Sequence, residues 1–130
     1  MEQPVFAQIM EAVEADILTG AYKVDDLIIS TNQIARLYNV NPATAVKAVA
    51  KLTDAGVLYK RRGIGMCVAA GAKEQIMARR RDLFLRQTIA EILAEARTLG
   101  MTVDELVEVI RQQGSDIRNS DIQEESAHER

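Results

Sequence analysis

The chain has 130 residues, of which 48% are hydrophobic and 27% charged, and its formal net charge at pH 7 is −3. This length allows one modest folded domain plus an appendage and excludes a large multidomain protein. The longest apolar runs are too short to span a membrane, and the N-terminus lacks the basic-then-apolar pattern of a signal sequence, so we expect a cytoplasmic protein.

The single cysteine, Cys67, cannot form an intrachain disulfide, which is consistent with a reducing compartment. It lies in an apolar stretch, and we expect it to be a small buried residue of a strand.

The charge is unevenly distributed along the chain. Residues 1–35 carry six acidic residues and one lysine, whereas residues 36–65 carry six basic residues and Asp54 as their one acid. The second segment therefore has a net charge of +5. Local charge, rather than the overall balance, determines where an anionic partner binds. A solvated basic face is the alternative interpretation when the charge is considered alone.

Residues 4–20 predict the first helix. Phe6, Ile9, Val13 and Ile17 recur at helical spacing and would form one buried face, and Gly20 marks the helix end. A helix that binds a partner through this stripe is the alternative. A short strand at residues 27–28 is expected to follow and to pair with a later hairpin.

A capping box predicts the start of a second helix. Ser30 can accept a hydrogen bond from the third helical amide, and Gln33 can bond back to the amide of Ser30. Residues 38–40 would form a tight turn into a third helix, which completes a helix-turn-helix. The side chains of the second helix that we expect in the core are Ile34, Ala35, Leu37 and Tyr38.

The third helix is predicted to begin at Pro42 and to stop at Gly56. Asn41 can cap it, and Pro42 takes the first helical position, where its missing N–H costs nothing. One apolar face is expected to be buried, and it comprises Ala45, Ala48, Val49 and Leu52. The opposite side is short and polar or basic, and it comprises Asn41, Thr44, Lys47 and Lys51.

Residues 57–68 predict a small basic hairpin, with strands at residues 57–59 and 66–68 around a glycine turn at residues 62–65. A helix with short exposed residues, followed at once by such a hairpin, is the arrangement with which a winged helix binds DNA. The helix needs small or hydrogen-bonding residues to approach base edges in the major groove. The hairpin needs glycine for close approach and arginine for charge.

Three segments carry a resemblance to a known family: Asn-Pro-Ala-Thr-Ala-Val-Lys at 41–47, Leu52 to Gly56, and Tyr-Lys-Arg-Arg-Gly-Ile-Gly-Met at 59–66. They resemble the DNA-binding domain of GntR-family transcription regulators, and the short chain is similar to the YtrA-like subfamily. The resemblance implies a mainly α fold with a small β-hairpin, in which an N-terminal winged helix-turn-helix precedes a two-helix dimerisation appendage. It also implies a dimeric repressor that binds a double-stranded DNA operator and controls a transporter operon.

Candidate DNA contacts follow from the helix-turn-helix and the hairpin. Asn41, Ala43, Thr44 and Lys47 are expected at base edges, with Ala43 against a thymine methyl group. Phosphates or neighbouring bases would be contacted by Thr31, Asn32, Gln33, Arg36 and Lys51. The tip of the hairpin and its flank would be formed by Lys60, Arg61, Arg62, Gly63 and Gly65.

The chain departs from the family pattern at two places. Many GntR proteins have an Arg-Glu pair where this chain has Asn32 and Gln33, so the operator preference of relatives does not transfer to it. The usual Pro-Gly-Asp turn is replaced by a turn that contains Val24 and Asp25.

Residues 73–99 predict a long helix with a basic cluster at Arg79–Arg81, followed by apolar residues at alternating four- and three-residue spacing. Thr102 and Glu105 form a second capping box, which would begin a short helix that stops at Gly114. Two such helices cannot enclose a core, so we expect a second copy of the chain to cover them. The predicted dimer contacts are Leu85, Ile89, Ile92, Leu93, Ala96, Leu99, Leu106, Val107 and Ile110.

The predicted domains are a DNA-binding domain at residues 1–71, a helical dimerisation region at 72–113 and a disordered acidic tail at 114–130. The Arg79–Arg81 cluster could touch the DNA flanks, form salt bridges between chains, or stay solvated.

No catalytic residue, metal site or cofactor is predicted, and we do not expect an enzyme. The sequence contains one histidine, His128, and has no nucleophile–base set or phosphate-binding loop. The alternative function is a winged-helix protein-interaction module without specific DNA binding, which predicts an apolar or acidic exposed helix face. A small-molecule effector stays unknown.

Overall fold

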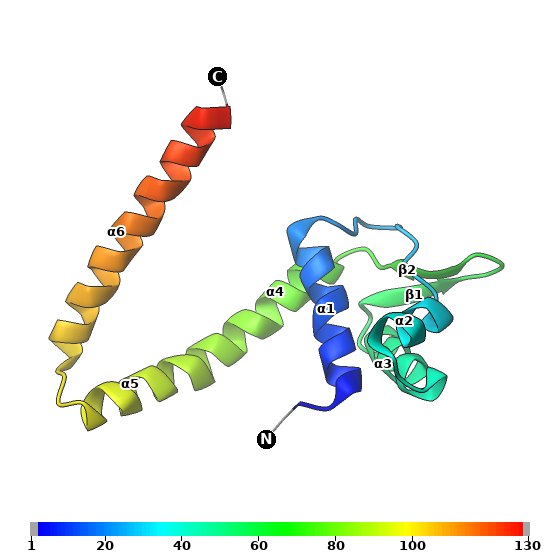
Figure 1. Cartoon of the computed structure of the whole chain (residues 1–130), viewed down its shortest axis with the longest axis horizontal. Coiled ribbons are helices and arrows are strands. Elements are labelled where there is room, and N and C mark those ends of the chain that lie inside the picture. The colour runs from blue at the N-terminus through cyan, green and yellow to red at the C-terminus, as the bar shows by residue number, and fades with distance from the viewer. Residues whose placement is uncertain (1–2, 129–130) are drawn as a thin grey trace. The chain divides into compact units, whose positions relative to one another are not determined.

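The computed structural model describes the backbone of residues 3–128 and the side chains of residues 3–117. The chain forms two compact units, and the division lies between Asp82 and Leu83. The first unit contains α1 (Val5–Thr19), α2 (Thr31–Tyr38), α3 (Pro42–Asp54), β1 (Leu58–Arg61), β2 (Gly65–Val68) and nearly all of α4 (Ala72–Leu83) (Figure 1). The second unit contains the π-helical segment η1 (Phe84–Thr88), α5 (Ile89–Thr98) and α6 (Val103–His128).

One hydrophobic core joins the helices and the hairpin of the first unit. Its largest fully buried side chains include one from each of five elements, namely Ile9, Ile34, Leu52, Leu58 and Ile76. Burying a side chain of this size stabilises the fold by about 1.5–3 kcal/mol. Both α1 and α2 pack against α3. The predicted fold class, mainly helical with one small hairpin, is therefore confirmed.

Local sequence signals determine where α2 and α3 begin. The Ser30 hydroxyl accepts a hydrogen bond from the Gln33 amide at 3.1 Å, and the Gln33 side chain accepts one from the Ser30 amide at 2.8 Å. Asn41 caps α3 by accepting from the Ala43 amide at 2.9 Å. Between the helices, Asn39 adopts a left-handed conformation with φ 52°. These caps and this turn give the predicted helix-turn-helix.

One residue of α2 was assigned to the core wrongly. Leu37 is 71% exposed, whereas Ile34 and Ala35 are buried and Tyr38 is half-buried. Leu37 follows the buried Ala35 by two residues, which puts its side chain about 200° around the helix axis from that of Ala35.

The hairpin pairs β1 with β2 antiparallel, in a register that opposes Leu58 to Val68 and Arg61 to Gly65. The strand expected at residues 27–28 is a single bridge, in which Leu27 pairs with Cys67. The Ile28 amide extends this pairing by donating to the Met66 carbonyl at 3.0 Å. Cys67 is fully buried, as expected for a small residue inside this sheet.

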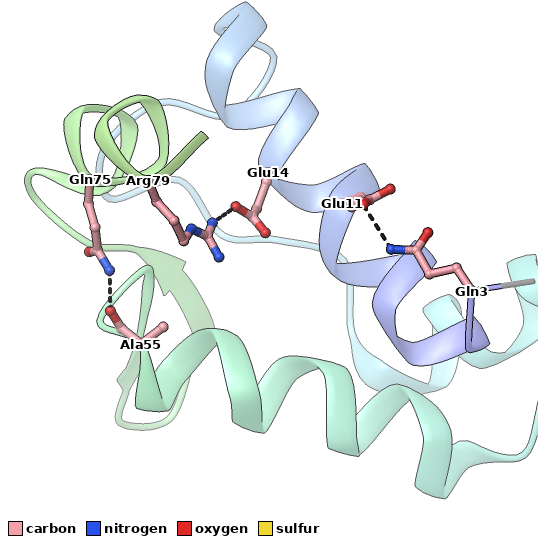
Figure 2. Close-up of polar contacts among 6 residues, drawn as sticks. All are labelled: Gln3, Glu11, Glu14, Ala55, Gln75 and Arg79. Carbon is pink, nitrogen blue, oxygen red and sulfur yellow. Dashed lines mark hydrogen bonds and ion pairs between the residues drawn. The ribbon is translucent and has the colours of Figure 1, made fainter. Parts of the chain in front are cut away.

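Helix α4 belongs to the first unit, although the sequence predicted a division at residues 71 and 72. Ala72 and Ile76 are fully buried, and the Gln75 side-chain amide donates to the Ala55 carbonyl at the end of α3. Arg79 forms an ion pair with Glu14 of α1, whose side chain is buried (Figure 2). These contacts hold α4 against the winged helix.

The second unit differs from the prediction in two ways. The helix expected to continue to Leu99 contains a π-helical segment at Phe84–Thr88, and α6 does not stop at Gly114 but continues to His128. Gly114 lacks the positive φ that ends α5 at Gly100 (φ 73°), and a glycine inside a helix costs only about 1 kcal/mol relative to alanine. Residues 114–128, predicted to be disordered, are thus helical, while residues 129–130 lie outside the described part.

The capping box predicted for α6 is formed in part. The Thr102 hydroxyl accepts a hydrogen bond from the Glu105 amide at 3.1 Å, as expected for a cap. The Glu105 carboxylate accepts from the Thr102 hydroxyl at 3.2 Å. Among the helices of the described residues, none is long and apolar enough to cross a membrane.

Candidate nucleic-acid interface

The outward face of α3 is the centre of the candidate interface. Ala43 and Lys47 are exposed as predicted, and Thr44 is half-buried on the flank of the helix. Asn41 uses its side-chain oxygen for the cap, which leaves its side-chain N–H groups able to donate to another acceptor. The buried face consists of Ala45, Ala48, Val49 and Leu52, as predicted.

Two lysines of α3 lie together on the flank of the helix that faces Phe6 of α1. The Lys47 ammonium is 4.1 Å from the centre of the Phe6 ring, and the Lys51 ammonium is 5.5 Å from it. A cation over an aromatic face is stabilised by about 0.5–1 kcal/mol at an exposed site. Phe6, which the sequence assigned to the core stripe of α1, therefore also holds two cations at the flank of α3.

Helix α2 and the start of α3 border a shallow hollow of about 450 Å³. Its lining includes two predicted contacts, Asn32 and Arg36, and two residues of the turn, Asn39 and Val40. Asn32 and Arg36 are both exposed. The hollow thus combines an amide and a guanidinium, which are groups that bind phosphate or base edges.

A second hollow, of about 330 Å³, lies between the hairpin and α2. It brings together four predicted contacts, Thr31 and Gln33 of α2 with Lys60 and Gly65 of the hairpin. The side-chain oxygen of Gln33 accepts the hydrogen bond of the capping box, so its side-chain N–H groups can donate to a ligand.

We use the term wing for the hairpin turn, residues 61–65. Arg61 and Arg62 are exposed, and Gly63 has φ 77°, a conformation that favours glycine. Gly65 has φ 139°, and a Cβ atom there would lie 2.9 Å from the Leu27 side chain. Glycine at position 65 therefore serves the packing of the hairpin against residue 27, in addition to any role in approaching DNA.

The base of the wing is attached to the turn that precedes α2. The Tyr59 hydroxyl donates a hydrogen bond to the Asp25 carboxylate at 2.7 Å, and this bond raises the pKa of Tyr59 above its ordinary value. Asp25 has φ 70°, and its amide donates to the Val68 carbonyl at 2.8 Å. The turn that contains Val24 and Asp25 thus has a left-handed residue and is linked to β1.

Sequence reasoning missed three exposed apolar residues in this region. Val46 is 52% exposed, Ile64 in the wing is 57% exposed, and Ala50 is exposed on the outward face of α3. The signal was present for Val46 and Ala50, because helical spacing puts them opposite the buried face. Apolar residues are usually assigned to the core, so these were not considered as candidate DNA contacts.

The predicted dimer contacts lie in the second unit. Leu85, Ile92, Leu93, Leu99 and Ile110 are exposed, and Ile89, Leu106 and Val107 are half-buried. Ala96 is buried within its own chain, where the carbonyl of Ala96 accepts from the Met101 amide. Several large apolar side chains on η1, α5 and α6 therefore remain uncovered in the single chain.

Among the described residues, no group of three or more His, Cys, Asp or Glu side chains could hold a metal ion.

A helix-turn-helix, formed here by α2 and α3, that is followed by a basic β-hairpin defines the winged helix class of domain. The chain belongs to the GntR family of bacterial regulatory proteins, whose family model matches residues 6–68. A solved transcriptional regulator of the GntR family from Bacteroides thetaiotaomicron is 30% identical, with a TM-score of 0.74, and the match covers 85% of this chain and 97% of that one.

Two further relatives extend the comparison. The HTH-type transcriptional repressor YtrA of Bacillus subtilis (strain 168) is 24% identical over 115 residues, which cover 88% of each chain. This similarity along most of both chains supports the YtrA-like assignment. The DNA-binding domain of AraR, solved in complex with operator ORR3, is 30% identical, with a TM-score of 0.51, over 53% of this chain and 83% of that one.

Proposed function

We propose that this protein is a sequence-specific DNA-binding transcription regulator, and that it acts as a dimeric repressor on a two-fold operator. The observation that carries this proposal is the exposed outward face of α3 beside a basic wing, in the segment with a net charge of +5. The family and the operator complex of a related domain support the same conclusion.

In the proposed complex, α3 enters the major groove and the wing lies along the adjacent phosphates or minor groove. Small residues at the start of α3 permit its close approach to base edges. Arg36, Lys60, Arg61 and Arg62 supply positive charge around it. The lysines beside Phe6 add to this charge at the flank of the helix.

Dimerisation is proposed for the second unit, through its uncovered apolar side chains. A two-fold dimer would present two winged helices to half-sites about one helical turn apart. The YtrA-like resemblance further implies an operon for a transporter as the target, and a cytoplasmic location follows from binding genomic DNA.

The first experiment is a selection from genomic fragments with the purified full chain, followed by sequencing and by binding assays at two salt concentrations. We expect recovery of a palindromic site, bound at least 1,000-fold more tightly than random DNA. Binding that is uniform across sequences and steeply salt-dependent would contradict sequence specificity. Absence of binding at low salt would instead favour a protein-interaction module.

A further inference from the structure

The outward face of α3 carries an apolar strip in its middle. Ala43, Val46 and Ala50 are all exposed, and their spacing of three and four residues puts them on one side of the helix. Val46, the largest of the three, is 52% exposed. None of these side chains can donate or accept a hydrogen bond.

Part of the bonding capacity of the polar groups around this strip is already in use. Asn41 accepts a hydrogen bond from the Ala43 amide, and Thr44 is half-buried. The ammonium groups of Lys47 and Lys51 lie over the Phe6 ring. The middle of the outward face of α3 is therefore apolar, and the ammonium groups of Lys47 and Lys51 lie on the side of it that faces Phe6.

The chemistry of the major groove limits what such a strip can recognise. The thymine C5-methyl group is the one apolar group that the four base pairs present there, and alanine or a side-chain methyl contacts it favourably. A cytosine amino group or a guanine oxygen that faced Val46 would lose water without gaining a partner. Arg36 lies at a hollow that Pro42 of α3 also lines, and Lys60 lies at one that Val49 of α3 also lines. Basic residues this near to α3 favour DNA over an apolar protein as the occupant of the strip.

We propose that Ala43, Val46 and Ala50 recognise thymine methyl groups, so that the operator half-site carries thymines at the positions that face α3. The inference rests on the proposed function, since it specifies what the same surface recognises. It assigns the central specificity of α3 to shape and methyl contact rather than to bidentate hydrogen bonds.

The test removes single methyl groups from the DNA. Each thymine in a half-site of the selected operator is replaced by deoxyuridine, which keeps Watson–Crick pairing and lacks only the C5-methyl group. At the position that faces Val46 we expect affinity to fall about fourfold, the loss that corresponds to one buried methyl group. Fluorescence anisotropy with the full chain measures it.

Two variants connect this loss to the strip. Val46→Ala is expected to weaken binding to the thymine operator about fourfold or more, and to make binding insensitive to deoxyuridine at that one position. Val24→Ala is the matched control, because Val24 is also 52% exposed and lies outside α3. It should leave affinity and the deoxyuridine effect unchanged. Alanine is the best helix former, so Val46→Ala should fold.

Specific outcomes would overturn the inference. Unchanged affinity for an operator with deoxyuridine at every half-site position would contradict it, as would full methyl sensitivity in Val46→Ala. Selected half-sites without thymine would do the same. Each of these outcomes leaves the proposed function intact, whereas failure of the genomic selection to recover any site would contradict the proposed function itself.

Discussion

Arg62 lies in the wing next to Gly63, with its side chain exposed. An arginine in this position can either bond to a base edge in the minor groove or neutralise a phosphate. The two roles differ in what they do to specificity. A base contact adds discrimination between sequences, while a phosphate contact adds affinity that salt weakens equally for every sequence.

Replacing Arg62 by alanine should separate these roles. If the side chain contacts a base, Arg62→Ala should weaken operator binding by roughly 1–3 kcal/mol and relax the preference at one position. If it contacts phosphate, the loss should be uniform across sequences, and the salt slope should fall by about one unit. Binding isotherms at several salt concentrations measure both quantities.

The control for this experiment is Lys73→Ala, which removes one positive charge from an exposed residue of α4 outside the predicted interface. It should change the binding little. A loss in Lys73→Ala equal to that in Arg62→Ala would mean that only overall charge is being measured.

Residues that act locally could be predicted from the sequence, while those that depend on a distant neighbour could not. The caps formed by Ser30 and Asn41 involve partners within three residues, and they are present as predicted. The lysine–Phe6 cluster joins α1 to α3, and no pattern within either helix indicates it. Val46 is a different case, because the helical spacing that predicted the buried face of α3 also put Val46 outside that face.

At the scale of elements, α4 shows why the predicted domain boundary was displaced. Gly71 marked a plausible end of the first domain, but the residues that bind α4 to α1 and α3 are single positions spread over two turns. Glu14 is 4% exposed, and its recorded partner is Arg79 (Figure 2). The arginine cluster, interpreted from the sequence as solvated, DNA-flanking or interchain, thus contributes Arg79 to an intrachain ion pair.

Removing Arg79 should destabilise the first unit. Arg79→Ala leaves the Glu14 carboxylate buried without this partner, which costs on the order of 1–3 kcal/mol once the partial exposure of Arg79 is taken into account. Urea unfolding followed by circular dichroism should show a lower midpoint with an unchanged slope.

Two further variants make that experiment decisive. Arg80→Ala removes the exposed neighbouring arginine and should stay within about 0.5 kcal/mol of the parent. Adding Glu14→Gln to Arg79→Ala should restore part of the lost stability, because a neutral amide is cheaper to bury than an unpaired carboxylate. Equal losses in Arg79→Ala and Arg80→Ala would argue that the ion pair does not stabilise the fold.

For the whole molecule, the proposed dimer would account for the exposed apolar side chains of the second unit. Exposed residues such as Ile92 and Leu93 on α5 would be covered by a second copy. The spacing of these residues could be predicted from the sequence, but the π-helical segment before them could not, since no glycine or proline occurs in Phe84–Thr88.

Sedimentation of the purified chain should show a dimer at micromolar concentration. Ile92→Glu is expected to shift it toward monomer and to weaken binding to a palindrome far more than binding to a single half-site, because linked sites raise the effective concentration. Ala94→Glu adds the same charge on the other side of α5 and should leave the dimer intact. A parent protein that stays monomeric well above micromolar concentration would refute the dimer.

Cys67 gives the molecule a property that its position in β2 makes available. It is the single cysteine of the chain, it is fully buried, and it is paired both with Tyr59 across the hairpin and with Leu27 at the sheet edge. A thiol reagent can reach its sulfur only when this sheet separates. The rate of labelling therefore reports how often β2 separates from β1 and from residue 27, and each chain carries one internal probe of that opening.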